Sequence, residues 1–381
     1  MVSANKGGGG SEELWIQSAI VLKTLGHEVC AFTNWPASSK RRLDQLRQAG
    51  VEHRPLATGN GLLRRLLSRL IPSRLSPIGR LRRGLKKVRP NFVFFSSGTS
   101  LDGLDLLETI HMSGIPHAAV THLVSPDHWP DDAVAALMIR LLSKTRRFWA
   151  VSQHNLDLLQ TQLAYQIPRA HIARNPFLVS GDPLPWEQNS LPNPEDNHRQ
   201  ARFAMPARLH PRTKGHDILV KVLAMPKWQA RNWRVSIYGS GSSEERLIAL
   251  VAQHGLQERI IFRGQTSDIR ALWAEHDALL VPSRHEGLPL TVVEAMWLGR
   301  LVIAQPAGGT AEVMQDGKTG YVADGIGDAF FDAVLERAWN DRSNWPAVAT
   351  AAAAHIRQII SKHPEQDFAQ ELISLAQNSN N

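Results

Sequence analysis

The sequence is poor in cysteine and has no long hydrophobic run. Cys30 is the only cysteine among 381 residues, so no disulfide can form within the chain and a reducing cytosol is the expected compartment. No stretch approaches the roughly 20 consecutive apolar residues that a membrane-spanning helix needs, and no secretory hydrophobic region follows Met1. We therefore expect a cytoplasmic protein without a disulfide framework or a membrane-spanning helix.

Acidic residues are absent from residues 62–89, which contain ten Lys and Arg. The whole chain has 43 Lys and Arg against 35 Asp and Glu, a net charge of +8, so this stretch supplies the entire positive balance. Its leucines recur at helical spacing, which is typical of an amphipathic helix on an anionic membrane surface. A helix packed on the core with a solvated arginine face is the alternative, and both remain open. The candidate membrane- or acceptor-facing residues are Arg64, Arg65, Arg69, Arg82, Arg83 and Lys86.

The same basic stretch lacks the interleaved aromatic residues that stack on nucleic-acid bases. We therefore expect no nucleic-acid partner. A basic chain requires an anionic partner, which is then a phosphate compound or an acidic membrane. An acidic membrane surface is a possible partner of residues 62–89.

The length of 381 residues indicates two domains, because it exceeds one typical domain and two of about 180 residues fit the usual size. Residues 179–200 are rich in Pro, Asn, Ser and Asp without apolar periodicity, which predicts a linker. Strand and helix patterns alternate on both sides of it, so we expect an α/β protein of two doubly wound parallel sheets, in residues 1–178 and 201–363. A last amphipathic helix is expected in residues 364–381. No repeat of 20–50 residues is evident, which sets solenoids aside.

Residues 279–309 are the stretch around which the second domain is organised. An apolar strand stops at Pro282, a polar loop carries Glu286, and a helix starting near Pro289 carries Glu294 before a further buried strand at 301–304. Backbone amides at a helix start favour an anion, and the carboxylates can accept hydrogen bonds from hydroxyl groups. The combination predicts a nucleotide-sugar site. Two glutamates at this spacing taken alone would more often be solvated surface residues.

Further polar and glycine residues follow predicted strands. Arg208 at a strand end and Lys214 before a helix are placed to neutralise a diphosphate, and glycine turns that allow close backbone approach occur at Gly239 with Gly241 and at Gly308 with Gly309. Near the amino terminus, the glycine run that includes Gly9 and Gly10 opens a helix that Ser11 could cap, with Glu12 and Glu13 in its first turn. His122 ends a predicted strand, at the edge where open sheets bind ligands, although a lone histidine there is more often structural.

The segment Glu-Gly-Leu-Pro-Leu-Thr-Val-Val-Glu-Ala-Met, residues 286–296, resembles the paired-glutamate motif of retaining glycosyltransferases of the GT-B superfamily, family 4 (glycosyl transferases group 1). The resemblance implies a GT-B fold, in which two Rossmann-like domains face a cleft. It implies that Glu294 binds the nucleotide ribose, that Glu286 contacts the donor sugar, and that Arg208 and Lys214 hold the diphosphate. It places His122 beside the sugar as a further catalytic residue. The implied donor-binding residues are Gly9, Gly10, Gly239, Gly241, Gly287, Leu288, Leu290, Thr291, Glu294, Gly308 and Gly309.

The resemblance also implies an activity: retaining, metal-independent transfer of a hexose from a UDP- or GDP-linked sugar to the hydroxyl group of a glycan or lipid-linked acceptor. Such a reaction belongs to cell-surface polysaccharide or glycolipid biosynthesis, in the cytoplasm or peripherally on the cytosolic face of a membrane, and needs no cofactor and no metal. The family has a full first strand where only Val2-Ser3-Ala4 stand here, so we expect a truncated first strand and a C-terminal helix that crosses back to the first domain.

Two other functions remain as alternatives. A non-catalytic GT-B protein could bind a nucleotide or a glycan, and a nucleotide-sugar 2-epimerase shares the same fold. The intact set Arg208, Lys214, Glu286 and Glu294 argues against the first, and the paired-glutamate motif favours a transferase over an epimerase.

Overall fold

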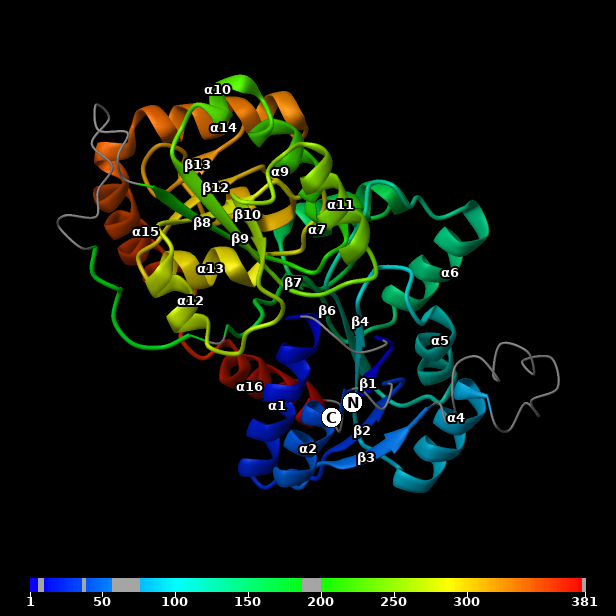
Figure 1. The fold of residues 1–381 in the computed structure, drawn as a ribbon. Helices are drawn as coiled ribbons and strands as arrows, with labels where there is room; N and C mark the ends of the chain where they lie inside the picture. The colour runs from blue at the N-terminus through cyan, green and yellow to red at the C-terminus, as the bar shows by residue number, and fades with distance from the viewer. Residues whose placement is uncertain (6–9, 36–38, 57–75, 178, 187–199, 379–381) are drawn as a thin grey trace. The chain divides into compact units, whose positions relative to one another are not determined.

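The computed structural model describes residues 1–5, 10–35, 39–56, 76–177, 179–186 and 200–378. The chain divides into two compact units, the first formed by Met1–Pro176 with His363–Asn381 and the second by Phe177–Lys362 (Figure 1). Gly9 and the basic residues Arg64, Arg65 and Arg69 lie outside the described residues, as does most of the predicted linker.

The first unit is built on a parallel sheet of seven strands in the order β3-β2-β1-β4-β5-β6-β7. β1 contains only two residues, yet it lies in the sheet interior between β2 and β4, with Val2 opposite Phe32 and Phe95. The expected short first strand is therefore a central one. The strands are β1 (Val2–Ser3), β2 (Cys30–Thr33), β3 (Glu52–Pro55), β4 (Val93–Ser97), β5 (His117–Thr121), β6 (Phe148–Ala150) and β7 (Ala170–Ile172).

Helices cover both faces of this sheet, which explains why its inner strands carry buried side chains on both sides. On β4, Phe95 packs in the core with α4, α5, α6 and α7, while Phe94 packs in the core on the other face with α1, α2 and α16. The helices are α1 (Glu13–Thr24), α2 (Lys40–Gln48), α4 (Pro77–Val88), α5 (Leu104–Met112), α6 (Asp132–Leu142), α7 (Gln153–Leu163) and α16 (Pro364–Gln377).

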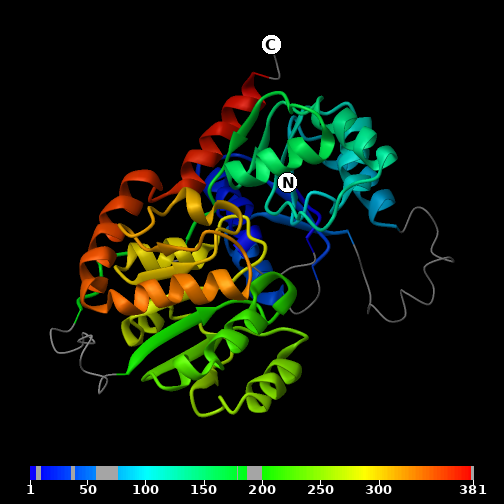
Figure 2. The ribbon, with the colours of Figure 1, turned by 90° about the horizontal axis from the view of Figure 1, so that it is seen from above.

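The C-terminal helix α16 is an integral part of the first unit. It lies beside α1 (Figures 1 and 2), and the ring of Phe368 stacks edge-on against Phe94 and Trp149 at centroid distances of 5.2 and 4.7 Å. Edge-to-face contacts of this kind add to the burial of apolar area. The C-terminal residues thus help to cover the sheet formed by residues near the amino terminus.

The second unit contains a parallel sheet of six strands in the order β10-β9-β8-β11-β12-β13. Successive residues of β11 point into different cores, Leu280 into one and Leu279 into the other, as the alternation of side chains along a strand requires. The strands are β8 (Ala201–Pro206), β9 (Trp233–Tyr238), β10 (Ile260–Phe262), β11 (Ala278–Val281), β12 (Leu301–Ala304) and β13 (Tyr321–Val322). The predicted α/β class with two parallel sheets is confirmed.

The helices of the second unit again lie on both faces of its sheet. Residues of α9, α10, α11 and α14 form one core, and residues of α12 and α13 with the later part of α15 form the other. Their bounds are α8 (Pro211–Lys214), α9 (His216–Leu223), α10 (Pro226–Gln229), α11 (Glu244–Gln253), α12 (Ile269–Glu275), α13 (Leu290–Trp297), α14 (Asp328–Asn340) and α15 (Trp345–Ile359).

The first residues of the predicted linker pack on the second unit. Leu184 N donates a hydrogen bond to Leu298 O at 2.9 Å, and Trp186 Nε1 donates to Gly299 O at 2.9 Å. Arg300 NH1 donates to Leu184 O at 3.1 Å. Leu184 and Trp186 are thus fixed to the rest of the second unit by hydrogen bonds of main-chain and side-chain groups.

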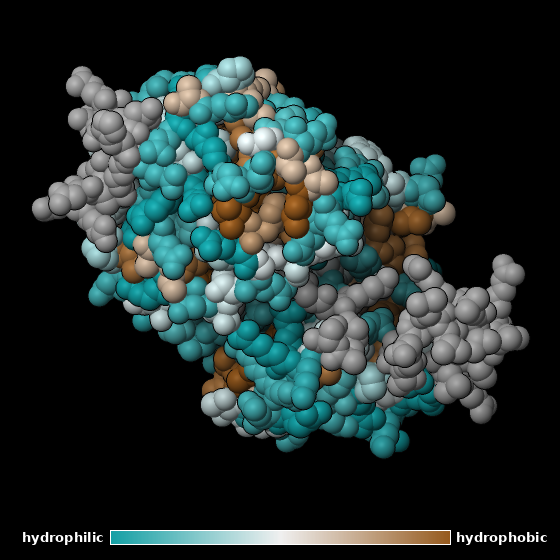
Figure 3. Space-filling model, viewed as in Figure 1, coloured by the Kyte–Doolittle hydropathy of each residue, from teal (hydrophilic) through white to brown (hydrophobic). Residues whose placement is uncertain are grey.

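Most of the face shown in Figure 3 is hydrophilic, with smaller hydrophobic areas between. The large apolar side chains that are exposed among the described residues are distributed over several elements: Leu25, Met112, Trp129, Ile248, Ile326, Phe330 and Ile359. Among the helices that the structure describes, each is too short or too polar to cross a membrane.

Candidate functional site

Several candidate residues of the second unit directly follow the carboxyl ends of its parallel strands. Arg208 follows β8, the turn with Gly239 follows β9, Glu286 follows β11, and Gly308 follows β12. In a parallel sheet these ends share one edge, which is where open α/β sheets bind ligands. The topology therefore gathers side chains that are up to 100 residues apart in the sequence.

Lys214 and Glu286 form an ion pair at this edge. Lys214 Nζ donates hydrogen bonds to Glu286 Oε1 at 2.6 Å and to Oε2 at 2.8 Å. Only 19% of the lysine side chain and 8% of the glutamate side chain are exposed. A buried charge is costly unless it is paired, so each group offsets the burial cost of the other.

The lysine is fixed by the segment that follows it. Gly215 has φ +71°, and a Cβ there would lie 1.9 Å from Pro282 O, so only glycine allows α8 and the loop after β11 to come this close. Arg284 of that loop donates two hydrogen bonds to Asp217, at 2.8 and 2.7 Å. Burial alone would raise the pKa of Asp217, but the hydrogen bonds and charge of Arg284 outweigh it and hold this pKa below its usual range. The two segments are thus clamped together around Lys214 and Glu286.

Glu294 lies on α13, which begins directly after Pro289. It is buried, with 5% of its surface exposed. Leu288 is buried just before the helix, while Leu290 and Thr291 in the first turn are half-buried. A surface position for Glu294, the alternative that the sequence left open, is therefore excluded.

The turn after β12 packs on the loop that carries Glu286. Gly309 N donates to Gly287 O at 2.6 Å. Gly308 has φ +57°, and a Cβ there would lie 2.0 Å from Glu286 O. Both glycines belong to a 3-10 helix of five residues, Gly308–Glu312. The glycine pair is thus needed for the contact between the two loops.

A second glycine turn supports the loop with Arg208. Gly239 has φ +137°, and a Cβ there would lie 2.0 Å from Ala207 O. Gly241 approaches Leu209 O in the same way, and Leu209 N donates to Ser240 O at 3.0 Å. The backbone on both sides of Arg208 is therefore held, while its side chain is exposed.

His216 is a residue of this region that the sequence did not single out. It is 1% exposed, and neither ring nitrogen has a hydrogen-bond partner in the described structure. Burial, and next the charge of Lys214, lower its pKa to about 4. It lies between the lysine and the Asp217 clamp in the chain, so its neutral ring adjoins a cationic site. No spacing rule for helices or strands would have identified it.

In the first unit, His122 directly follows β5 and is 5% exposed. Its Nε2 lies 3.2 Å from Ser96 Oγ, within hydrogen-bonding distance. Burial lowers the pKa of His122 to about 4, although the side chain of Asn175 acts in the opposite direction. The histidine is therefore neutral at physiological pH, in which state one ring nitrogen donates and the other accepts.

Glu12, which the sequence placed in the first turn of a helix, has a structural role that the sequence did not indicate. It is fully buried and accepts hydrogen bonds from Trp35 Nε1 at 2.7 Å, from Trp15 Nε1 at 3.1 Å and from Ser3 Oγ at 3.2 Å, as well as from the Asn5 side chain. These neutral donors hold the end of β1, the start of α1 and the loop after β2 to one carboxylate.

The expected cap by Ser11 is wrong. α1 starts at Glu13 with Glu12 as its N-cap residue, and no side chain caps the helix. Ser11 lies instead in a 3-10 helix, Gly10–Glu12, whose first residue Gly10 is half-buried. The physical reason is that the hydrogen bonds of the buried Glu12 carboxylate fix the backbone in the turn directly before α1.

The described part of the basic stretch is α4, and its apolar side packs in the core. Leu81 and Leu85 are buried in the first unit, whereas Arg82, Arg83 and Lys86 are exposed. For α4 the core-packed interpretation is therefore correct, and its leucines are not available to a membrane. The exposed basic face remains as a surface for an anionic partner.

The structure thus brings together Lys214, Glu286 and the Gly287–Gly309 contact. Arg208, which precedes Lys214 in the chain, has an exposed side chain. Within the described ranges, no group of three or more His, Cys, Asp or Glu side chains is arranged to hold a metal ion.

The fold was compared with solved structures. The Anabaena protein Alr3699/HepE, solved in complex with UDP-glucose, superposes with a TM-score of 0.73 at 18% identity, covering 98% of both chains. A glycosyltransferase from Rickettsia africae gives a TM-score of 0.72 at 17% identity, covering 98% of this chain and 97% of the other. Together with the two parallel sheets, these similarities define the GT-B fold.

Sequence comparison shows which known proteins the second unit is similar to. Residues 200–338 match the family model described as glycosyl transferases group 1. The chain is 34% identical over 127 residues to a lipopolysaccharide core biosynthesis mannosyltransferase, LpcC, of Rhizobium leguminosarum, 32% of this chain and 36% of that protein. It is 34% identical over 138 residues to a GDP-mannose-dependent phosphatidylinositol monomannoside mannosyltransferase of Mycolicibacterium smegmatis, 34% of this chain and 36% of that protein. The matches thus span about a third of these relatives. The chain thus has the GT-B fold, and residues 200–338 of its second unit are similar to glycosyl transferases group 1.

Proposed function

We propose that this protein is a retaining glycosyltransferase of family 4, which transfers a hexose from a nucleotide sugar to a hydroxyl acceptor. The observation that carries the proposal is the Lys214–Glu286 pair at the carboxyl edge of the second sheet, together with Glu294, which is buried on the helix that follows the same loop. A cation and two carboxylates on one edge match the needs of a donor that has a diphosphate at its centre and hydroxyl groups at both ends.

The chemistry of the reaction assigns a role to each group. Cleavage of the bond between sugar and phosphate leaves a negative charge on the diphosphate, and preorganised cations stabilise such a charge best. Lys214 and the exposed Arg208 would supply them, with the main chain of the Gly308–Gly309 turn beside them. Glu286 would contact the donor sugar and Glu294 the ribose, while the neutral His122 would donate to, or accept from, a sugar hydroxyl.

The donor class is proposed from relatives. HepE is solved with UDP and UDP-glucose, and the mycobacterial relative is named as GDP-mannose-dependent. We propose a UDP- or GDP-linked sugar, and an acceptor that is a glycan or a lipid-linked glycan in cell-surface polysaccharide or glycolipid biosynthesis. Metal independence is part of the proposal, since cationic side chains would take the place of a metal at the diphosphate, and activity is then expected to persist in EDTA.

A thermal-shift screen with UDP, GDP and ADP sugars tests the donor assignment. One nucleotide class should raise the melting temperature of the protein, and labelled sugar from that donor should reach an acceptor or water. Replacing Lys214 with Ala should lower kcat more than it raises KM, because its interaction strengthens as the diphosphate leaves. The exposed Lys318, replaced in the same way, is the control. Absence of stabilisation by every donor would overturn the proposal.

A second, separate proposal concerns where the enzyme works. We propose that basic side chains of the first unit, among them Arg82, Arg83 and Lys86, hold it at an anionic membrane surface on the cytosolic side. Each Lys or Arg near such a surface contributes about 1 kcal/mol, screened over about 8 Å at physiological salt. Replacing these three residues with Gln should reduce co-sedimentation with anionic vesicles and leave donor affinity unchanged. Equal binding to neutral and anionic vesicles would end this proposal.

A further inference from the structure

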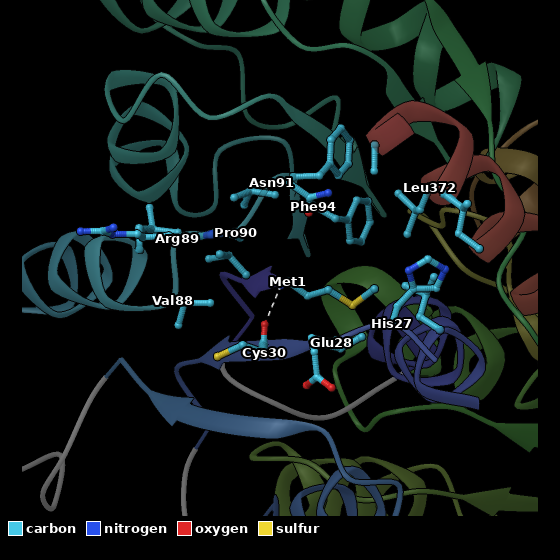
Figure 4. A pocket seen from close by; sticks show the side chains of 18 of the residues that line it. Met1, His27, Glu28, Cys30, Val88, Arg89, Pro90, Asn91, Phe94 and Leu372 are labelled. Carbon is cyan, nitrogen blue, oxygen red and sulfur yellow. Dashed lines mark hydrogen bonds between the residues drawn. The ribbon is translucent and has the colours of Figure 1, made fainter. Parts of the chain in front are cut away.

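Two features of the described residues lie outside the roles proposed above. The first is a cavity of about 420 Å³ in the first unit, around Met1 (Figure 4), and its lining is separate from the candidate residues. The second is the ion pair between Asp217 and Arg284 in the second unit. Of the two, the ion pair adjoins the candidate site, because its members stand close to Lys214 and Glu286 in the chain.

The Asp217–Arg284 pair is bidentate. Arg284 Nη1 donates to Asp217 Oδ1 at 2.8 Å, and Nη2 donates to Oδ2 at 2.7 Å, the arrangement in which a guanidinium group holds a carboxylate with the most specific geometry. Nη1 also donates to Pro211 O at 3.1 Å. The two side chains are 28% and 29% exposed, so salt screens this pair less than it screens a fully exposed one.

The main chains of the same two segments are joined as well. Arg284 N donates to Thr213 O at 2.8 Å. Gly215, with φ +71°, ends α8 and precedes α9, so the chain turns sharply between Lys214 and Asp217. These two side chains therefore leave opposite sides of one turn, and each reaches a different residue of the loop after β11.

Each segment carries one positive and one negative charge, and the observed alignment joins opposite charges in both contacts. Lys214 meets Glu286, and Asp217 meets Arg284. In the other alignment the two cations would meet each other, and so would the two carboxylates. Since contacts between like charges are unfavourable, the four side chains select one alignment of the two segments.

The two ion pairs differ in what a bound diphosphate does to them. With the proposed donor in place, Lys214 turns from Glu286 toward the phosphate groups, and the first pair is weakened. The Asp217–Arg284 pair takes no part in this exchange and can hold the two segments together while the lysine changes its partner. Such support matters because a small displacement of a group at a reacting centre lowers the rate by a large factor.

We propose that Asp217 and Arg284 are positioning residues, which fix the backbone of Lys214 against the loop of Glu286 while the lysine exchanges this carboxylate for the diphosphate of the donor. The inference rests on the proposed function for the identity of the diphosphate. The placement of Lys214 itself can be measured without any donor.

Asp217→Asn removes the charge of the pair with little change in the size of the side chain. Asp316→Asn is a matched control in the same unit, because Arg337 donates two hydrogen bonds to Asp316, at 2.8 and 3.1 Å. Trace acetylation with acetic anhydride and mass spectrometry report the exposure of each lysine, with the exposed Lys144 as the internal reference. Lys214, which is 19% exposed, should be labelled at least about threefold faster in Asp217→Asn and at the native rate in Asp316→Asn.

Turnover gives a second measurement. Asp217→Asn should lower kcat about tenfold with a smaller change in KM for the donor, because the ground state needs the exact place of Lys214 less than the transition state does. Arg284→Gln should have the same effect. The double variant should be no worse than either single variant, since both residues act through one pair.

An unchanged rate of Lys214 labelling in Asp217→Asn would overturn the positioning role. Equal acceleration in Asp316→Asn would overturn it too, because the second unit would then be loosened in general. If Asp217→Asn does not fold, Arg284→Lys gives the same test, since lysine keeps the charge and loses the bidentate contact. If the native protein uses no nucleotide sugar, the proposed function fails, and the labelling rates still decide whether the pair positions Lys214.

Discussion

Lys214 and Glu286, 72 residues apart in the chain, share one ion pair in which both carboxylate oxygens accept hydrogen bonds from the ammonium group. The lysine is proposed to serve the diphosphate and the glutamate to serve the sugar. A diphosphate that reaches Lys214 must therefore compete with Glu286, so the carboxylate weakens binding of the leaving group while it helps to bind the sugar.

Replacing Glu286 with Gln should therefore change binding and turnover in opposite directions. Free UDP or GDP, whichever the donor screen selects, should bind more tightly by about tenfold, or about 1.4 kcal/mol, because Lys214 no longer shares its charge. Turnover should be lost with the contact to the sugar. Calorimetry and an initial-rate assay measure the two effects, with Glu245→Gln at a side chain that is 91% exposed as the control. Weaker binding of the free nucleotide would contradict the competition.

Replacing Glu294 with Gln should weaken donor binding. A hydrogen bond between a carboxylate and a ribose hydroxyl is charge-assisted and contributes about 1.5–3 kcal/mol, which the neutral amide would lose in part. Calorimetry with the intact donor measures the loss, and the melting temperature of the variant shows whether the buried position tolerates the amide. If a folded variant binds the donor as tightly as the native protein, Glu294 does not contact it.

Gly308→Ala should reduce activity because the new Cβ would displace the loop that carries Glu286. Gly317 gives a matched control, since its φ of +71° is also left-handed but a Cβ there would have no atom within 4 Å. Both variants should lose about 1–2 kcal/mol of stability from the backbone conformation alone, and only Gly308→Ala should also lose activity and further stability. Equal losses in both would mean that the contact with Glu286 O has no consequence.

Stability should fall as the pH is lowered from about 7 to 5. His122 and His216 have pKa values of about 4 in the folded protein, against about 6.5 when unfolded. Between these values the unfolded chain binds protons that the folded chain does not, so unfolding becomes more favourable in acid, by about 1.4 kcal/mol per pH unit for each histidine. His216→Phe should make the free energy of unfolding less dependent on pH over this range, whereas His128→Gln, at an exposed position, should not. An unchanged pH dependence in His216→Phe would contradict the burial of a neutral ring.

The strands that lie inside the two sheets were predictable because both of their faces are buried. β11 and β12 are continuous apolar runs that end where the strands end. β3 was not predicted, since it is an edge strand that reads Glu-His-Arg-Pro and carries no apolar alternation. α6 was also missed, although Asp131 caps it through a hydrogen bond to Val134 N at 2.8 Å, a signal that the sequence does contain.

The site residues of the second unit could be found from the sequence because they occur in one continuous motif and its neighbours. The ion pair that two of these residues form could not be found from the sequence. The pairing of Lys214 with Glu286 depends on the approach of Gly215 to Pro282, a through-space contact that no spacing along the chain reports. The same holds for Glu12, whose partner Trp35 lies 23 residues away.

The Glu12 carboxylate has a further consequence for the history of the sequence. It accepts hydrogen bonds from four neutral donor residues. Replacing Trp35 or Trp15 by an aromatic residue without an N–H would leave the buried carboxylate with fewer hydrogen-bond partners. Replacing Glu12 would leave two indole N–H groups without an acceptor. Each single substitution is therefore expected to destabilise the protein, whereas replacing all of these residues together by apolar ones need not do so. Ser3, Glu12, Trp15 and Trp35 should therefore be inherited together or lost together among the descendants of a common ancestor.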